Sequence, residues 1–198
     1  ATSTPPALVL RDAPLPGLPR MPSPPLSRTV GITQGALTSI RTIIARSDPT
    51  LETGGALFGH ENALVITSAS APGPNAVHQP GYFLRDLEHT QLAADRAHKV
   101  DRSQWIGEWH THPNGPPEPS PLDLNTYISH LVDLELRFQR FIALIGSPNP
   151  RPHLSAWVLA QSPDGIELHR AALALTATDQ GSRNQMPPGE ATEVQHRS

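Results

Sequence analysis

Two histidines and an aspartate stand at a spacing that suits a metal site. His110 and His112 are separated by one residue, and Asp123 ends a Ser-Pro-Leu-Asp stretch that begins at Ser120. In a β-strand, residues i and i+2 lie on the same face, so both imidazoles can face one ion, and a following turn can supply the carboxylate. Imidazole and carboxylate are the usual protein ligands of a catalytic zinc, whose fourth position stays open for water. The spacing therefore predicts a Zn²⁺ site made of His110, His112 and Asp123.

The stretch from Ser120 to Asp123 is also typical of a helix start. Serine is a favoured N-cap residue, proline suits the first helical position, and a carboxylate three residues after the cap completes a capping box. The two interpretations are compatible, because a carboxylate in the first turn of a helix can still face the preceding loop. Asp123 can therefore cap a helix and bind a metal.

Together these residues resemble the signature of the JAMM, or MPN+, metalloproteases, which consists of an upstream Glu, then HxHP, then SxxD. The likeness is to the prokaryotic JAB branch, and it includes residues 52–59, which resemble the family's strand carrying the catalytic Glu. The resemblance implies that Glu52 is the general acid/base and that Ser120 is a hydrogen-bonding group of the active site. It also implies an α/β sandwich, in which helices flank a curved mixed β-sheet, similar to a cytidine deaminase-like architecture.

The chemistry of such a site is amide hydrolysis. Zinc lowers the pKa of a water ligand to about 7, so a nearby carboxylate can accept its proton while the water attacks an amide carbon. Glu52 would accept that proton and then return it to the leaving amine, and the ion or Ser120 would stabilise the developing oxyanion. No covalent intermediate is needed.

Glu108 is a second candidate for the base or for a ligand. Alternation along the expected strand places Ile106, Glu108, His110 and His112 on one face. The other interpretation of Glu108 is an exposed or salt-bridged carboxylate at the end of a strand. Many eukaryotic members of the family read Gly-Trp-Tyr-His-Ser-His where residues 107–112 of this chain read Gly-Glu-Trp-His-Thr-His, so the charge beside the site differs. The remaining histidines, His78 among them, lack paired spacing and are expected on the surface or on helix faces.

Three functions are compatible with this pattern. The resemblance favours an isopeptidase that cleaves ubiquitin-like proteins from conjugates or processes their C-terminal tails, beside ubiquitin-activating and conjugating enzymes in bacterial operons that include antiphage defence operons. The second is a peptidase that trims a sulfur-carrier protein in cofactor or amino-acid biosynthesis. The third is a non-catalytic MPN scaffold, which would need none of the residues named above.

Composition narrows these choices further. The chain has no cysteine, which excludes a thiol nucleophile, a thioester-forming enzyme and a cysteine zinc site. A net charge of −3 gives no reason to expect nucleic acid as a partner, and no segment of the sequence is apolar enough for a membrane span. Cytoplasmic localisation is the default expectation. Because residues 1–27 are rich in proline and residues 177–198 are polar, we expect two disordered tails around one metalloprotease domain at 28–176.

Within that domain the spacing of the apolar residues alternates between the period of about 3.6 residues that is typical of helices and the period of about 2 that is typical of strands. Thr33 is a plausible N-cap for the first helix. Helices are predicted at about 34–44, 86–100 and 121–136, and strands at 30–33, 56–59, 64–68, 105–110, 138–145, 154–160 and 166–170. Residues 72–86 read as a long loop, whose Phe83 and neighbouring apolar residues either contact a protein substrate or anchor the loop in the core.

Overall fold

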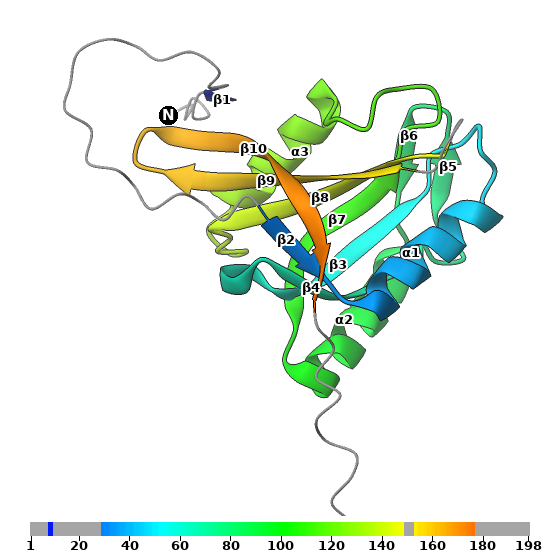
Figure 1. Cartoon of the computed structure of the whole chain (residues 1–198), viewed down its shortest axis with the longest axis horizontal. Helices are drawn as coiled ribbons and strands as arrows, with labels where there is room; N and C mark the ends of the chain where they lie inside the picture. Colours follow the sequence, from blue (N-terminus) through cyan, green and yellow to red (C-terminus); the bar gives the residue numbers. More distant parts are fainter. Residues whose placement is uncertain (1–7, 10–28, 149–152, 177–198) are drawn as a thin grey trace, which may run out of the picture.

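A curved eight-stranded sheet with helices on both faces forms the body of the protein (Figure 1). The computed structural model describes residues 8–9, 29–148 and 153–176. The helices are α1 (Gln34–Arg46), α2 (Leu87–Asp101) and α3 (Pro121–Val132), with a short 3₁₀ turn at Glu61–Ala63. The strands are β1 (Leu8–Val9), β2 (Thr29–Ile32), β3 (Gly54–His60), β4 (Val65–Ala69), β5 (Val77–Gln79), β6 (Tyr82–Leu84), β7 (Gln104–Thr111), β8 (Arg140–Ser147), β9 (His153–Ser162) and β10 (Gly165–Leu175).

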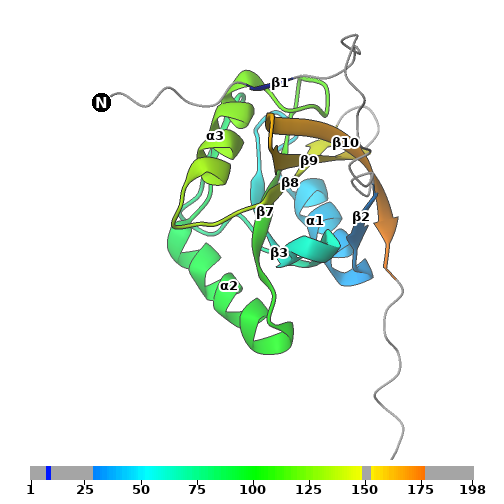
Figure 2. The same ribbon diagram turned by 90° about the vertical axis from the view of Figure 1, so that its left-hand side faces the viewer.

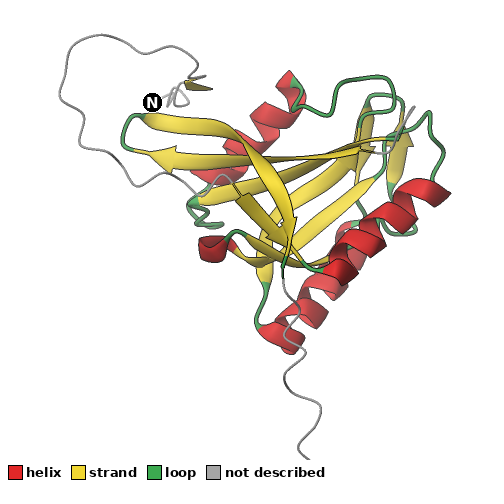
Figure 3. Ribbon diagram, viewed as in Figure 1, coloured by secondary structure: helices red, strands yellow, loops and turns green. Residues whose placement is uncertain are grey.

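The large sheet has the order β1-β10-β2-β4-β3-β7-β8-β9, and β10 also pairs with β9. The pairs β7–β8, β2–β4 and β10–β2 are parallel, whereas β3–β4, β3–β7, β8–β9 and β9–β10 are antiparallel. Because β10 contacts both β2 and β9, the sheet curls round on itself. Figure 3 shows the three helices packed around it. The predicted α/β sandwich with a curved mixed sheet is therefore confirmed.

Figure 2 shows α1 on one side of β7 and both α2 and α3 on the other. The core correspondingly lies on both faces of the sheet. On one face, α1 buries Ala36, Leu37 and Ile40 against the sheet, which is the helical spacing that the sequence shows. Thr33 caps this helix as predicted, because its side chain accepts a hydrogen bond from the N–H of Ala36 at 3.2 Å. On the opposite face, α3 packs Tyr127 and its neighbours against β8 and β9, and α2 covers β3. Burial of apolar side chains on both faces thus fixes β7 in the middle of the sandwich.

A bulge in β7 changes the predicted alternation of its side chains. Leu57 pairs with Gly107 and Phe58 pairs with Trp105, so Ile106 is an extra residue without a partner on β3. Ile106 therefore packs in the α1 cluster together with Trp109. The expectation that Ile106 shares a face with Glu108 and the histidines is wrong, although Glu108 and His110 do line one cavity.

The segment predicted as a long loop at 72–86 contains a hairpin. Strands β5 and β6 pair only with each other and form a separate two-stranded sheet. Helix α3 ends at Val132 rather than at residue 136, because Asp133 is the C-cap and Leu134, which is 89% exposed, has left the apolar face. The predicted tails, residues 1–27 and 177–198, lie outside the described residues except for Leu8–Val9, which pairs with β10. In the part of the chain that the structure describes, no helix is both long enough and apolar enough to cross a membrane.

Gly54 gives a test of the β3–β7 contact. A Cβ atom at Gly54 would lie 2.4 Å from the carbonyl oxygen of Trp109 and 2.9 Å from Cβ of His110. We expect Gly54→Ala to lower the free energy of unfolding by about 1–3 kcal/mol, because the backbone cannot move aside without breaking the ladder. Gly35→Ala is the matched control. It has no neighbour within 4 Å and lies in α1, so it should leave stability unchanged or raise it slightly. Urea unfolding monitored by circular dichroism measures both, and equal stabilities would contradict the close packing of Gly54.

Candidate metal centre

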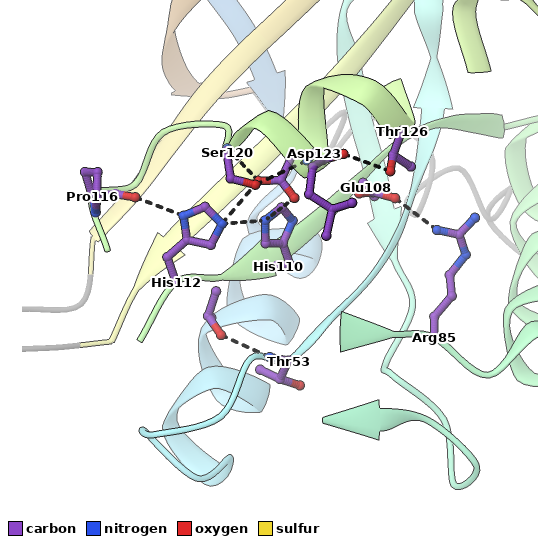
Figure 4. Close-up of polar contacts among 11 residues, drawn as sticks. Thr53, Arg85, Glu108, His110, His112, Pro116, Ser120, Asp123 and Thr126 are labelled. Carbon is purple, nitrogen blue, oxygen red and sulfur yellow. Dashed lines mark hydrogen bonds and ion pairs between the residues drawn. The ribbon is translucent and has the colours of Figure 1, made fainter. Parts of the chain in front are cut away.

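The two histidines meet at the end of β7. His110 lies in the strand and His112 follows it directly, and both are buried. Their Nε2 atoms are 2.9 Å apart. Nε2 of His110 lies 3.4 Å from Oδ1 of Asp123, and Nε2 of His112 lies 3.3 Å from Oδ2 of the same carboxylate (Figure 4). The structure thus brings together the three side chains that the sequence predicts as metal ligands.

This geometry fits a tetrahedral zinc ion. Zinc bonds of about 2.0–2.2 Å at tetrahedral angles separate neighbouring ligand atoms by about 3.3–3.5 Å. The two Nε2 atoms are 2.9 Å apart, and each lies near one oxygen of the Asp123 carboxylate, His110 near Oδ1 at 3.4 Å and His112 near Oδ2 at 3.3 Å. Nδ1 of His112 lies 3.0 Å from the carbonyl oxygen of Pro116. A carbonyl can only accept, so this nitrogen carries the proton, and Nε2 keeps a lone pair that points toward the other two ligand atoms.

The first turn of α3 holds the carboxylate in place. The N–H of Ser120 donates to Oδ2 of Asp123 at 2.7 Å, and the N–H of Asp123 donates to the Ser120 hydroxyl at 3.2 Å. These two bonds form a capping box with Pro121 at the start of the helix. Asp123 therefore caps α3 and faces the histidines at once, as its sequence position allowed.

Electrostatics keep this carboxylate ionised. Burial alone would raise the pKa of Asp123, but its contacts with His110 and His112 outweigh burial and hold the pKa well below its usual range. An ionised carboxylate beside neutral imidazoles is the protonation state in which these groups bind a divalent cation.

Glu52 lines the same cavity as His110, Ser120 and Asp123. Burial raises the pKa of the Glu52 carboxyl, and the nearby histidines oppose this shift in part. The residue after it is joined to the histidine strand, because the N–H of Thr53 donates to Oγ1 of Thr111 at 3.0 Å and the N–H of Thr111 donates to the carbonyl of Thr53 at 2.9 Å. The structure therefore places a partly buried carboxylate with a raised pKa beside the three converging ligands.

Glu108 has a different environment. Its carboxylate forms an ion pair with Arg85 at 3.0 Å, and the Arg85 guanidinium lies 5.0 Å from the centre of the Trp105 ring. Glu108 lines the cavity but is not among the side chains that converge as a metal site. Of the two sequence interpretations, the salt-bridged carboxylate is the one that the structure shows.

Several contacts of the site are not visible in the sequence pattern. His78, which we expected on the surface or on a helix face, is partly buried and contacts the backbone of Glu52. Trp157 on β9 donates its indole N–H to the carbonyl of Pro117 at 3.1 Å. The carbonyl of the preceding residue, Pro116, orients the imidazole of His112. Trp157 therefore holds in place the loop that orients this imidazole. His78 and Trp157 both bond to backbone carbonyls. Because every residue has a carbonyl, the residue types in the sequence do not show which residues these side chains contact.

Zinc affinity tests this outer contact. We expect Trp157→Phe to weaken zinc binding about tenfold, because the loop that carries the Pro116 carbonyl loses its tie to β9 and the His112 ring is oriented less firmly. Trp105→Phe is the matched control, since the indole of Trp105 also donates to a backbone carbonyl, that of Gly107, but not in this loop. Competition with a chromophoric chelator measures both affinities. An unchanged affinity in Trp157→Phe, or an equal loss in both variants, would contradict this role.

Comparison with known proteins agrees with the fold and the motif. The family model of prokaryotic homologs of the JAB domain matches residues 34–160. A curated relative from Escherichia coli (strain TW11681), named CD-NTase/cGAS isopeptidase, is 34% identical over 88 residues, which are 42% of this chain and 56% of that protein. The chain thus spans little more than half the length of this relative. The fold is also similar to the solution structure of a protein from Desulfitobacterium hafniense, with a TM-score of 0.52 and 20% identity over 79% of this chain and 99% of the other.

The family match begins at the start of α1 and ends within β9. It covers well over half of the chain and contains Glu52, both histidines, Ser120 and Asp123. The chain therefore belongs to the family of prokaryotic JAB-domain homologs.

Proposed function

We propose that the protein is a zinc-dependent isopeptidase that cleaves a ubiquitin-like protein from its conjugates or processes its C-terminal tail. The observation that supports this most strongly is the convergence of three ligand atoms from His110, His112 and Asp123 within 4.8 Å of one another, in a cavity that Glu52 also lines. Metal-assisted amide hydrolysis requires ligands such as two imidazoles and one carboxylate, together with a nearby general base.

In this proposal His110, His112 and Asp123 hold the ion. When bound, zinc supplies a Lewis acid that polarises the scissile carbonyl and makes water acidic enough to attack it. Glu52 accepts the proton of the attacking water and passes it to the leaving nitrogen. Its raised pKa lies closer to neutral pH, which suits a carboxyl group that must both accept and release a proton. Ser120 uses its hydroxyl oxygen to accept from the N–H of Asp123, so its own proton remains available to a developing oxyanion.

The shape of the site favours a substrate with polypeptide on both sides of the scissile bond. One hollow of about 280 Å³ runs between β6 and α3, and a second of about 510 Å³ lies against the loop at 113–121. Both are lined by Glu52, Gly81, Ser120 and Leu122, so they meet beside the metal centre. An extended tail in one hollow and the target in the other is the arrangement that an isopeptide substrate needs. A peptidase that trims one residue needs only a single closed-ended subsite, and a scaffold needs neither hollow nor ligands.

The rim of the first hollow offers a contact for such a tail. Tyr82, Leu84 and Leu122 lie around it and are 40%, 48% and 56% exposed. Exposed apolar side chains beside a short strand suit an extended peptide that pairs along the strand and places alternate side chains on the rim. We propose that the tail of a ubiquitin-like protein binds here, with its last carbonyl at the metal centre.

The relative named CD-NTase/cGAS isopeptidase suggests which conjugates to test first. We propose that this protein acts in the cytoplasm on a conjugate of a ubiquitin-like or CD-NTase-like protein, beside ubiquitin-activating and conjugating enzymes of an antiphage defence operon. The alternative, trimming of a sulfur-carrier protein, uses the same metal chemistry, so an assay of the two kinds of substrate distinguishes the two functions.

Substitution of Glu52 tests the base. We expect Glu52→Gln to retain zinc and to lose at least about 100-fold in kcat, because the amide cannot carry the proton. Glu108→Gln is the matched control, since it makes the same change in the same cavity on a carboxylate that Arg85 already engages. It should keep kcat within a few-fold. Cleavage of a fluorogenic ubiquitin-like fusion measures both, and full activity in Glu52→Gln with loss in Glu108→Gln would reverse the two roles.

Removal of the metal tests the mechanism as a whole. Cleavage of a ubiquitin-like fusion or a CD-NTase conjugate should stop when a chelator strips the protein and should return when zinc is added. Cleavage by the stripped protein at an undiminished rate would exclude the metal mechanism. Release of single C-terminal residues from a sulfur-carrier protein, with conjugates left intact, would favour the alternative function.

A further inference from the structure

The hairpin β5–β6 holds the backbone of Glu52. The N–H of Glu52 donates to the carbonyl of Gln79 at 2.9 Å, and the carbonyl of Glu52 lies 2.8 Å from Nδ1 of His78. Both polar groups of the Glu52 backbone are therefore bonded to two adjacent residues of β5. We infer that His78 is a positioning residue, whose ring N–H fixes the Glu52 backbone and thereby aims the Glu52 carboxylate at the metal centre. This inference rests on the proposed function, in which Glu52 is the general base.

The protonation of His78 follows from its partner. A backbone carbonyl only accepts hydrogen bonds, so Nδ1 of His78 must be the protonated nitrogen. The ring also packs against Phe83 of β6, with ring centres 5.4 Å apart. Phe83 in turn lies close to Gly54, where its Cε1 atom is 2.8 Å from the position a Cβ would take. The orientation of the imidazole is thus set by packing within the hairpin and against β3.

Glu52 needs this support because it precedes the sheet. The β3–β7 ladder begins at Gly54, which pairs with His110, and Thr53 is tied to Thr111. These contacts fix the chain only on the C-terminal side of Glu52. Before it, Leu51 is bonded to Asp48 in a local turn rather than to the sheet. His78 and Gln79 are therefore the described contacts that fix the Glu52 backbone itself to a neighbouring element.

The hairpin keeps its shape by contacts that do not involve His78. The N–H of Asp86 donates to the carbonyl of Pro72 at 2.9 Å, and the N–H of Asn75 donates to the Asp86 carboxylate at 3.1 Å. Arg85, directly after β6, forms the ion pair with Glu108. A substitution of His78 should therefore change the position of Glu52 more than the fold of the hairpin.

Three variants of His78 separate positioning from packing. His78→Phe keeps a ring against Phe83 but removes the donor, and we expect kcat to fall at least about tenfold with KM and zinc content nearly unchanged, because a small displacement of a general base is costly. His78→Asn places an amide N–H near the position of Nδ1 and should restore most of kcat. His78→Gln places its amide one bond further, near the position of Nε2, and should not. A fall in zinc content with kcat, or no rescue by Asn, would overturn the inference.

Hydrogen exchange gives a readout that needs no activity. In His78→Phe the N–H of Glu52 keeps its bond to the Gln79 carbonyl but the Glu52 carbonyl loses its bond to His78, so the Glu52 backbone is held to β5 by one bond in place of two and its amide should exchange faster than in the wild type. The amide of Thr53, held by Thr111, should be unchanged. If the wild type cleaves no conjugate, the proposed function fails, yet faster exchange at Glu52 alone still supports the role of His78 in placing the backbone. If the wild type cleaves, and His78→Phe keeps both kcat and the exchange rate of Glu52, the inference is wrong while the proposed function stands.

Discussion

The antiparallel contact between the start of β3 and the end of β7 is the constraint on which the site depends. Gly54 pairs with His110, and Thr53 and Thr111 exchange two hydrogen bonds beyond the end of that ladder. This contact sets Glu52 beside the two histidines, although nearly 60 residues separate them in the chain. Only glycine fits at position 54, because any Cβ would collide with the backbone of Trp109. The double glycine at 54 and 55 is therefore a requirement of the site as well as of the strand.

The proposed metal site and the start of α3 share the same atoms. The Asp123 carboxylate accepts a hydrogen bond from the N–H of Ser120, a backbone group at the start of α3. The same carboxylate faces the imidazoles of both histidines and gives these buried polar groups a partner. His112 is oriented through Pro116, in a loop whose prolines restrict φ even in the unfolded chain. Ordering this loop costs less entropy than ordering a flexible one, and this lowers the cost of holding the three candidate ligands together.

The sequence predicts the parts of the site that follow from local geometry. The i, i+2 spacing of His110 and His112 and the cap at Ser120 need only the backbone of one strand and one helix turn, and the structure has both. The bulge at Ile106 could not be foreseen, because it depends on the register with β3. The hairpin at 77–84 did leave a signal, since Pro80-Gly81 between Val77 and Tyr82 is typical of a turn, but three-residue strands give too short an alternation to recognise. The contact of His78 with Glu52 joins a side chain to a carbonyl 26 residues away, and carbonyls carry no sequence identity.

The same hairpin takes part in two tasks that can now be related. Its second strand and the residues after it line the hollow proposed for a substrate tail, through Tyr82, Leu84 and Arg85. Its first strand bonds both backbone groups of Glu52. Because β5 and β6 pair only with each other among the described strands, a peptide that binds along β6 would order the strand that holds the proposed general base. Binding energy from a part of the substrate remote from the scissile bond could then be used at the reacting carbonyl, which raises kcat rather than only lowering KM. Under the proposed function, a tail that fails to contact β6 would lose turnover as well as affinity, and the hairpin would link recognition of the tail to cleavage.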